Sequence, residues 1–117
     1  MTKEQIALAR RAVACKGWRW ARGMSNDQGQ TIDCVDLIPG KAYCGEWDAD
    51  MTALPDLEDP ATLGCLLALV RESLNSPRVH VLYVEGLYRW ECADNRTVHG
   101  VGATEAEALI ETLEYAP

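Results

Sequence analysis

The strongest pattern of apolar and polar positions begins in the middle of the chain. Asp59 and Pro60 suit the cap and the first position of a helix, and leucine or valine then recurs at helical spacing up to Leu74. Two runs rich in β-branched and aromatic residues follow at 79–84 and 87–92. The two residues between these runs, one of them glycine, predict a tight antiparallel hairpin.

The end of the chain completes this layout. Residues 97–101 suit a third strand, and Thr104 with Glu107 predicts a capping box for a final helix. The apolar residues of that helix share one side: Ala106, Leu109, Ile110 and Leu113. Its glutamates occupy the other: Glu105, Glu107, Glu111 and Glu114. We therefore expect an α+β fold, in which a small antiparallel β-sheet carries helices packed on one face.

The first third of the chain predicts one helix and two extended segments. Thr2 and Gln5 form a capping-box pattern, and helical spacing continues to Lys16. Residues 18–24 place two tryptophans on one face if they are extended, and residues 31–38 alternate as a strand does. These two runs can pair as a loose hairpin. The expected order of elements is then αββ followed by αβββα.

Length and hydropathy predict one domain outside the membrane. The 117 residues have the size of one domain, and 48% apolar content is typical of a globular protein. The longest apolar run, 65–70, is far shorter than the roughly 20 residues that span a bilayer. The start of the chain has no signal-peptide pattern. We therefore expect a single domain over residues 1–117, located in the cytoplasm.

Charge is unevenly distributed along the chain. The formal charge of −7 favours solubility and argues against a nucleic-acid binder that works through net charge. Residues 1–22 nevertheless hold one acid and six bases: Lys3, Arg10, Arg11, Lys16, Arg19 and Arg22. Either this segment packs on the acidic body, or an acidic face stays exposed and binds a basic partner. Nucleic-acid contact through the basic segment is a further alternative.

Residues 41–60 show no sustained period but concentrate acidic side chains. Five acids and one tryptophan from this stretch form our candidate binding site: Glu46, Trp47, Asp48, Asp50, Asp56 and Glu58. Tryptophan is prominent in the binding energy of protein interfaces, and the acids suit a partner protein with a basic surface. Asp48, Asp50 and Asp59 also follow the outline of a calcium loop, but Ala53 stands where its sharp turn needs glycine. We predict no metal.

No stretch of the chain carries a specific catalytic signature. The five cysteines lack the paired spacing of a zinc site: Cys15, Cys34, Cys44, Cys65 and Cys92. Most of them are expected to be reduced packing residues. His80 and His99 lie in strand patterns, and no nucleotide-binding motif occurs. We predict neither cofactor nor enzyme activity. The alternative is a small enzyme with Cys34 or Cys44 as nucleophile.

The order helix, three-stranded meander, helix from Pro60 onward resembles the double-stranded RNA-binding domain fold, with Gly100 and Gly102 before the last helix. That resemblance implies an RNA-binding family whose final helix begins with basic residues. Here the helix begins with two acids: Thr104, Glu105, Ala106, Glu107. Acidic side chains at that position repel a phosphate backbone. We therefore expect the topology of this family but not its RNA binding.

Three strings together resemble small uncharacterised proteins encoded by bacteriophages and prophages. They are W-x-x-G-M at 20–24, L-P-D-L-x-D-P-A-T-L-G at 54–64 and G-A-T-E-A-E-A-L at 102–109. The resemblance implies an accessory role in the cytoplasm of a bacterial host and assigns no activity. We therefore expect a phage accessory protein that binds another protein through its acidic surface. One version of this hypothesis is inhibition of host nucleic-acid machinery at a site meant for phosphates, and a homo-oligomeric module is a further alternative.

Overall fold

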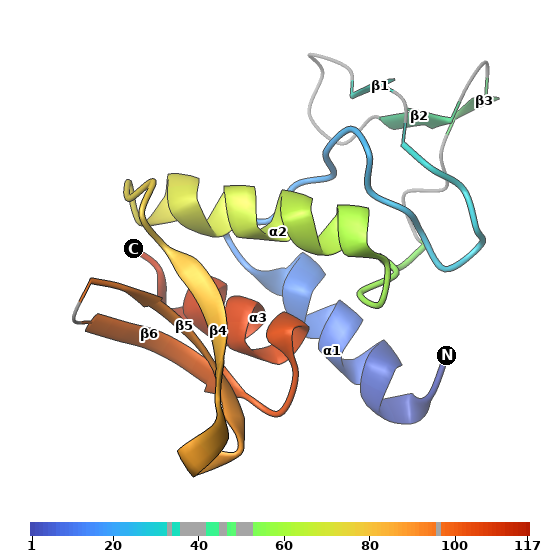
Figure 1. Ribbon diagram of the computed structural model, residues 1–117. Coiled ribbons are helices and arrows are strands. Elements are labelled where there is room, and N and C mark those ends of the chain that lie inside the picture. Colours follow the sequence, from blue (N-terminus) through green and yellow to red (C-terminus); the bar gives the residue numbers. More distant parts are fainter. Residues whose placement is uncertain (33, 36–41, 45–46, 49–52, 96) are drawn as a thin grey trace.

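The computed structural model describes residues 1–32, 34–35, 42–44, 47–48, 53–95 and 97–117. Within these residues the fold is α+β, as the sequence predicted (Figure 1). The helices are α1 (Lys3–Ala14), α2 (Pro60–Ser73) and α3 (Glu105–Tyr115). The larger antiparallel sheet consists of β4 (His80–Val84), β5 (Arg89–Asp94) and β6 (Thr97–Gly102), in that order. The smaller one consists of β1 (Cys34–Val35), β2 (Ala42–Cys44) and β3 (Trp47–Asp48).

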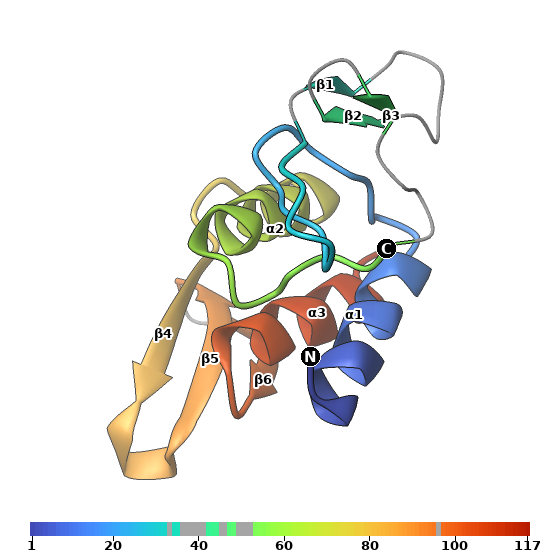
Figure 2. The same cartoon turned by 90° about the vertical axis from the view of Figure 1, so that its right-hand side faces the viewer.

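The helices lie on one side of the larger sheet. α3 contacts all three strands of this sheet, and both α1 and α2 contact α3. Figure 2 shows the sheet at one side of the molecule, with α3 beside it and α1 beyond α3. The predicted inward residues of α3 are buried: Ala106, Leu109, Ile110 and Leu113. They form the main core together with Leu66 and Val70 of α2 and Cys92 of β5.

Strand β6 approaches α3 so closely that two positions require glycine. A Cβ atom on Gly100 would lie 2.6 Å from the carbonyl oxygen of Ala108 and 2.8 Å from the backbone nitrogen of Thr112. A Cβ atom on Gly102 would lie 2.5 Å from Cβ of Glu107. Real Cβ atoms almost never come this close to other atoms. The two glycines before the last helix therefore set the distance between sheet and helix.

Side-chain caps begin α1 and α3 where the sequence predicted them. At α1 the box is complete, because Gln5 N–H donates to Thr2 Oγ1 at 3.1 Å and Thr2 N–H donates to Gln5 Oε1 at 2.8 Å. At α3 it is half complete. Glu107 N–H donates to Thr104 Oγ1 at 3.1 Å, but the Glu107 carboxylate accepts from Ala103 N–H instead of Thr104 N–H. α1 ends at Ala14, slightly before the predicted end.

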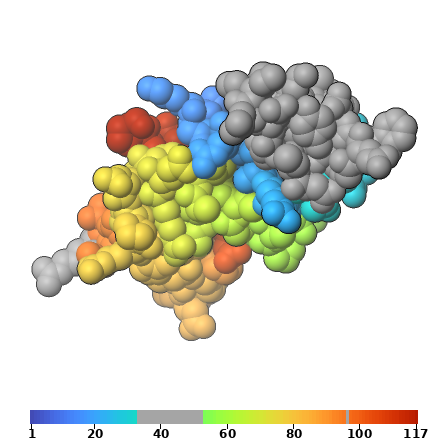
Figure 3. All heavy atoms as spheres, turned by 90° about the horizontal axis from the view of Figure 1, so that it is seen from above, coloured from blue at the N-terminus to red at the C-terminus, as the bar shows by residue number. Residues whose placement is uncertain are grey.

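Residues 18–24 do not form the predicted regular strand, but the end of this run pairs with the next run as predicted: Gly23 N–H donates to the Ile32 carbonyl and Ile32 N–H donates to the Met24 carbonyl, each at 2.8 Å. This segment is irregular and crosses α2 in the view of Figure 3. The Trp18 and Trp20 rings meet edge to face with centroids 5.6 Å apart, and Trp20 is buried against Leu69 of α2. Packing of the two rings on the helix therefore accounts for the irregular start of this segment, and pairing is confined to its end. Of the predicted strand at 31–38, residues 34–35 form β1, which pairs with β2; residues 33 and 36–38 lie outside the described residues.

The hairpin of β4 and β5 exists, but its predicted two-residue connection is wrong. Val84 pairs with Arg89, so four residues connect the strands. Glu85–Leu87 form a 3₁₀ turn, and Tyr88 follows in the left-handed region with φ of 50°. The residue with positive φ in this turn is therefore Tyr88 and not the glycine on which the predicted two-residue turn depended.

Candidate functional site

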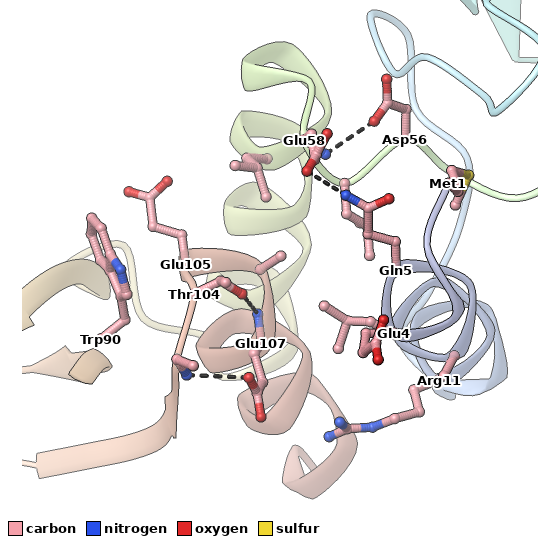
Figure 4. Close-up of a pocket in the computed structure, with 16 residues that line it drawn as sticks. Met1, Glu4, Gln5, Arg11, Asp56, Glu58, Trp90, Thr104, Glu105 and Glu107 are labelled. Atoms are coloured by element: carbon pink, nitrogen blue, oxygen red, sulfur yellow. Dashed lines mark hydrogen bonds between the residues drawn. The ribbon is translucent and has the colours of Figure 1, made fainter. Parts of the chain in front are cut away.

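A cleft of about 790 Å³ lies between α1, α3, β5 and the segment that leads into α2 (Figure 4). Its apolar lining comes from these four parts and from α2: Ala7, Leu8, Leu57, Leu63, Trp90 and Ala106. Among the described residues, its acidic lining consists of five carboxylate side chains: Glu4, Asp56, Glu58, Glu105 and Glu107. Arg11 is the one basic side chain of the described residues that lines it. The cleft thus combines an apolar surface with an excess of negative charge.

The segment that leads into α2 is joined to α1 by the acids of the cleft. The side-chain amide of Gln5 donates a hydrogen bond to Glu58 Oε1. Glu58 N–H donates in turn to Asp56 Oδ1 at 3.1 Å, which fixes the turn that carries both carboxylates. Gln5 therefore serves twice, because it also completes the cap of α1. These contacts keep Glu58 and α1 on facing sides of the cleft (Figure 4).

Two of the five carboxylates have no partner among the residues that the structure describes. Glu107 accepts a hydrogen bond from Ala103 N–H at 3.1 Å. Glu4 and Glu105, in contrast, make no hydrogen bond or ion pair within the described part of the chain. Both follow a capped helix start, where the helix dipole stabilises negative charge. Their carboxylate oxygens can therefore accept hydrogen bonds from a ligand.

The cation of the cleft is already neutralised. Arg11 Nη2 lies 2.6 Å from Glu114 Oε1, and Arg11 Nε lies 3.3 Å from Glu114 Oε2. This two-point contact raises the pKa of Arg11 and joins α1 to the end of α3. Because Glu114 balances Arg11, the net charge presented by the cleft comes from the carboxylates.

The position of Asp56 depends on a distant part of the chain. Asp56 N–H donates to the Ser25 carbonyl at 2.8 Å. Asp27 N–H donates to the Leu54 carbonyl at 2.7 Å, and Leu54 N–H donates to Asp27 Oδ1 at 3.2 Å. The segment that leads into α2 is therefore held by residues 25–27, almost thirty positions earlier.

Asn26 organises this support. Its side chain is 2% exposed, yet its polar atoms are satisfied. Asn26 Oδ1 accepts from the backbone N–H groups of Gln28 and Gln30 at 3.0 and 2.9 Å. Its Nδ2 donates to Gln30 Oε1 at 2.8 Å. The turn that carries Ser25 and Asp27 is thus built around one buried amide.

The structure brings together only part of the predicted site. Asp56 and Glu58 line the cleft, whereas Trp47 and Asp48 form β3 and their side chains lie outside the described residues. Glu46 and Asp50 lie outside the described residues. Sequence reasoning missed Glu4 and the two acids at the start of α3, which it took only for an outward face. The alternation of apolar and acidic residues from 102 onward could have singled out the acids of α3. No local pattern, however, shows that these acids lie across the cleft from Glu58.

The basic segment is partly neutralised by the acidic body. Besides Arg11 with Glu114, Arg19 Nη1 donates to Glu72 Oε1 at 2.9 Å. This contact raises the pKa of Arg19 and lowers that of Glu72. For these two arginines the first of the two interpretations of the basic segment is correct. The charge that remains for phosphate contacts is reduced accordingly.

The thiols that the structure describes are shifted away from reactivity. Burial raises the pKa of Cys15, Cys65 and Cys92, whereas a nucleophilic cysteine needs a lowered one. The side chains of Cys34 and Cys44, the alternative nucleophiles, lie outside the described residues.

The histidines have ordinary structural surroundings. His99 Nε2 lies 3.2 Å from Asp94 Oδ1, although the contact is not aligned as a hydrogen bond. Asp94 also accepts from Ser76 Oγ at 3.1 Å. His80 is exposed on β4, and its Nδ1 lies 3.1 Å from the Arg78 carbonyl oxygen. Neither ring lines the cleft.

No protein family, curated protein or solved structure matches this chain. The resemblances to phage proteins and to the double-stranded RNA-binding fold therefore stay predictions. Across the described ranges, no helix is long and apolar enough to cross a membrane. Over the same ranges, no three histidine, cysteine, aspartate or glutamate side chains converge as metal ligands.

Proposed function

We propose that this protein is a protein-binding module whose cleft receives a basic, partly apolar segment of another protein. The observation that carries the proposal is the pairing of an apolar lining with five carboxylates. Apolar burial supplies affinity, and complementary charge at the margin speeds association and selects the partner. A partner segment with lysine or arginine beside leucine or an aromatic residue satisfies both requirements.

The unpartnered acids support a cationic ligand. Glu4 projects from α1, and Glu105 lies beside Trp90 on the opposite side of the cleft (Figure 4). A carboxylate with no intramolecular partner gains more from a guanidinium than one already engaged, because no existing contact is lost. Trp90 is half-buried and lines the cleft, so an aromatic ring lies beside the acids; its ring centroid is 5.5 Å from that of Tyr83, which packs against it.

The same chemistry supports one class of partner. Proteins that act on nucleic acids present basic surfaces, and a row of carboxylates can occupy a place meant for phosphates. Host nucleic-acid enzymes are therefore the partner class we propose, with a phage accessory role as the corresponding biology.

The test compares two double variants with equal changes in charge. A partner is captured from bacterial lysate, identified, purified and titrated calorimetrically against each variant. Glu4→Gln with Glu105→Gln should weaken the complex about tenfold and flatten its dependence on salt, since both removed charges face the ligand. Glu72→Gln with Glu111→Gln is the control, because neither residue lines the cleft.

The proposal fails if the two double variants bind with equal affinity. A third variant, Glu46→Gln with Asp50→Asn, tests the remaining part of the site predicted from the sequence. Loss of binding in this variant alone would assign the partner contact to residues 46–50 and not to Glu4 and Glu105. Thermal unfolding of all three variants controls for changes in the fold.

A further inference from the structure

Strand β4 leaves one edge of the larger sheet unpaired within the described part of the chain. It is the outer strand, and among the described residues it pairs with β5 alone. Figure 2 shows β4 on the outer side of the sheet. Within the described residues, no backbone hydrogen bond other than those with β5 reaches residues 80–84. Every second residue of such a strand points its N–H and C=O groups outward, where they can pair with another strand.

The two edges of this sheet differ in protection. β4 contains no lysine, acid, proline or glycine, and its Leu82 and Tyr83 side chains are 37% and 46% exposed. β6, at the other edge, contains two glycines, and its register with β5 shifts at Cys92/Ala93. Bulges, charges and prolines are the usual devices that prevent pairing at an edge. The β4 edge lacks all three, so it is the edge suited to another strand.

Opposite charges stand at the two ends of β4. Arg78 precedes the strand and Glu85 follows it, and both side chains are exposed without a partner in the described part of the chain. When two copies of such a strand run antiparallel, the basic end of each meets the acidic end of the other. The segment from Arg78 to Glu85 is thus complementary to itself in charge.

We propose that two copies of this chain pair through β4 in antiparallel orientation and form one six-stranded sheet. A twofold axis at Leu82 places Val81 of each copy opposite Tyr83 of the other, a pairing of β-branched and aromatic residues that stabilises sheets. Arg78 of each copy then lies at the end that carries Glu85 of the second copy. β4 does not line the cleft, so the dimer leaves the proposed binding site free on each copy.

Sedimentation velocity over a range of concentrations tests this proposal. The wild-type chain is expected to sediment as a dimer. Arg78→Glu and Glu85→Arg, each alone, place like charges at both ends of the pair and should weaken dimerisation about tenfold or more. An equimolar mixture of the two variants should form a dimer with one copy of each. In this mixed dimer, residue 78 of each copy again lies near an oppositely charged residue 85 of the other copy. This recovery is specific to antiparallel pairing of two β4 strands.

A matched pair of lysine substitutions tests the edge itself. Leu82→Lys places two lysines opposite each other at the twofold axis and should yield a monomer. Val98→Lys adds the same charge at an exposed position of the other edge strand and should leave the dimer intact. A wild-type chain that stays monomeric at all concentrations overturns the proposal. So does a mixture of the two charge variants that fails to dimerise, or equal dissociation in Leu82→Lys and Val98→Lys.

Discussion

Replacement of Gly100 by alanine tests the close contact between sheet and helix. The new Cβ atom would lie 2.6 Å from the Ala108 carbonyl oxygen and 2.8 Å from the Thr112 nitrogen. Ordinary contacts begin near 3.4 Å, and both obstacles belong to the backbone of α3. β6 and α3 must therefore separate by several tenths of an ångström over the core. We expect the free energy of unfolding to fall by about 2 to 3 kcal/mol, as for other overpacked cores.

The same substitution at Gly64 is the matched control. Gly64 lies in α2, is exposed, and has no atom within 4 Å of the position of a Cβ. Alanine there should stabilise the protein by about 1 kcal/mol through its higher helix propensity. Urea unfolding followed by circular dichroism measures both changes. In thermal unfolding, Gly100→Ala should lower Tm by about 8 to 12 °C, and Gly64→Ala should raise it by about 4 °C.

The comparison of the two stability changes, a loss for Gly100→Ala and a gain for Gly64→Ala, tests the steric argument. If Gly100→Ala is as stable as the wild-type chain, β6 does not lie against α3 at this distance. If both variants lose stability equally, the loss reflects a general intolerance of substitution and not a steric contact. Either result would refute the packing of sheet and helix described above.

Two further predictions concern the buried amide and the thiols. Asn26→Ala removes three hydrogen bonds from a buried turn and should lower the free energy of unfolding by about 2 to 4 kcal/mol; an unchanged urea midpoint would contradict the role assigned to Asn26. Because burial raises the pKa of Cys92, the unfolded chain ionises first as pH rises, so stability is full at neutral pH and falls as pH rises above about 8.5, the ordinary pKa of a cysteine thiol. Urea unfolding across this range should show a shallower decline in Cys92→Ala, and rapid alkylation of Cys92 in the native protein at pH 7 would contradict its burial.

The half of the chain from Asp59 onward was largely predictable because its structure is local. Helix start signals at Asp59 and Thr104, and alternation in the strands, each depend on residues a few positions apart. The exceptions are also instructive. The β4–β5 turn is longer than its glycine suggested, since Tyr88 accepts a positive φ. Residues 18–24 look extended in sequence, but their tryptophans pack on a helix that lies forty positions later.

The cleft was only half predictable because it forms across the chain. Asp56 and Glu58 stood out as acids in an irregular stretch. Glu4 and Glu105 did not, since each belongs to the polar side of a helix and looks like ordinary solvated surface. What joins them is the contact of α1 with α3, fixed by Arg11 and Glu114, which lie 103 positions apart. No local pattern carries that information.

That long separation also governs how the molecule folds and opens. α2, the larger sheet and α3 are contiguous in sequence and can form early, whereas α1 must find α3 across the whole chain. The fully buried residues of α1 are Ala9 and Ala12, whose small side chains bury little apolar area. α1 is therefore expected to detach at a lower free energy than the rest of the fold, with faster amide hydrogen exchange than α3. A ligand that contacts both walls of the cleft would suppress this opening. Slower amide hydrogen exchange in α1 would therefore indicate that the ligand is bound.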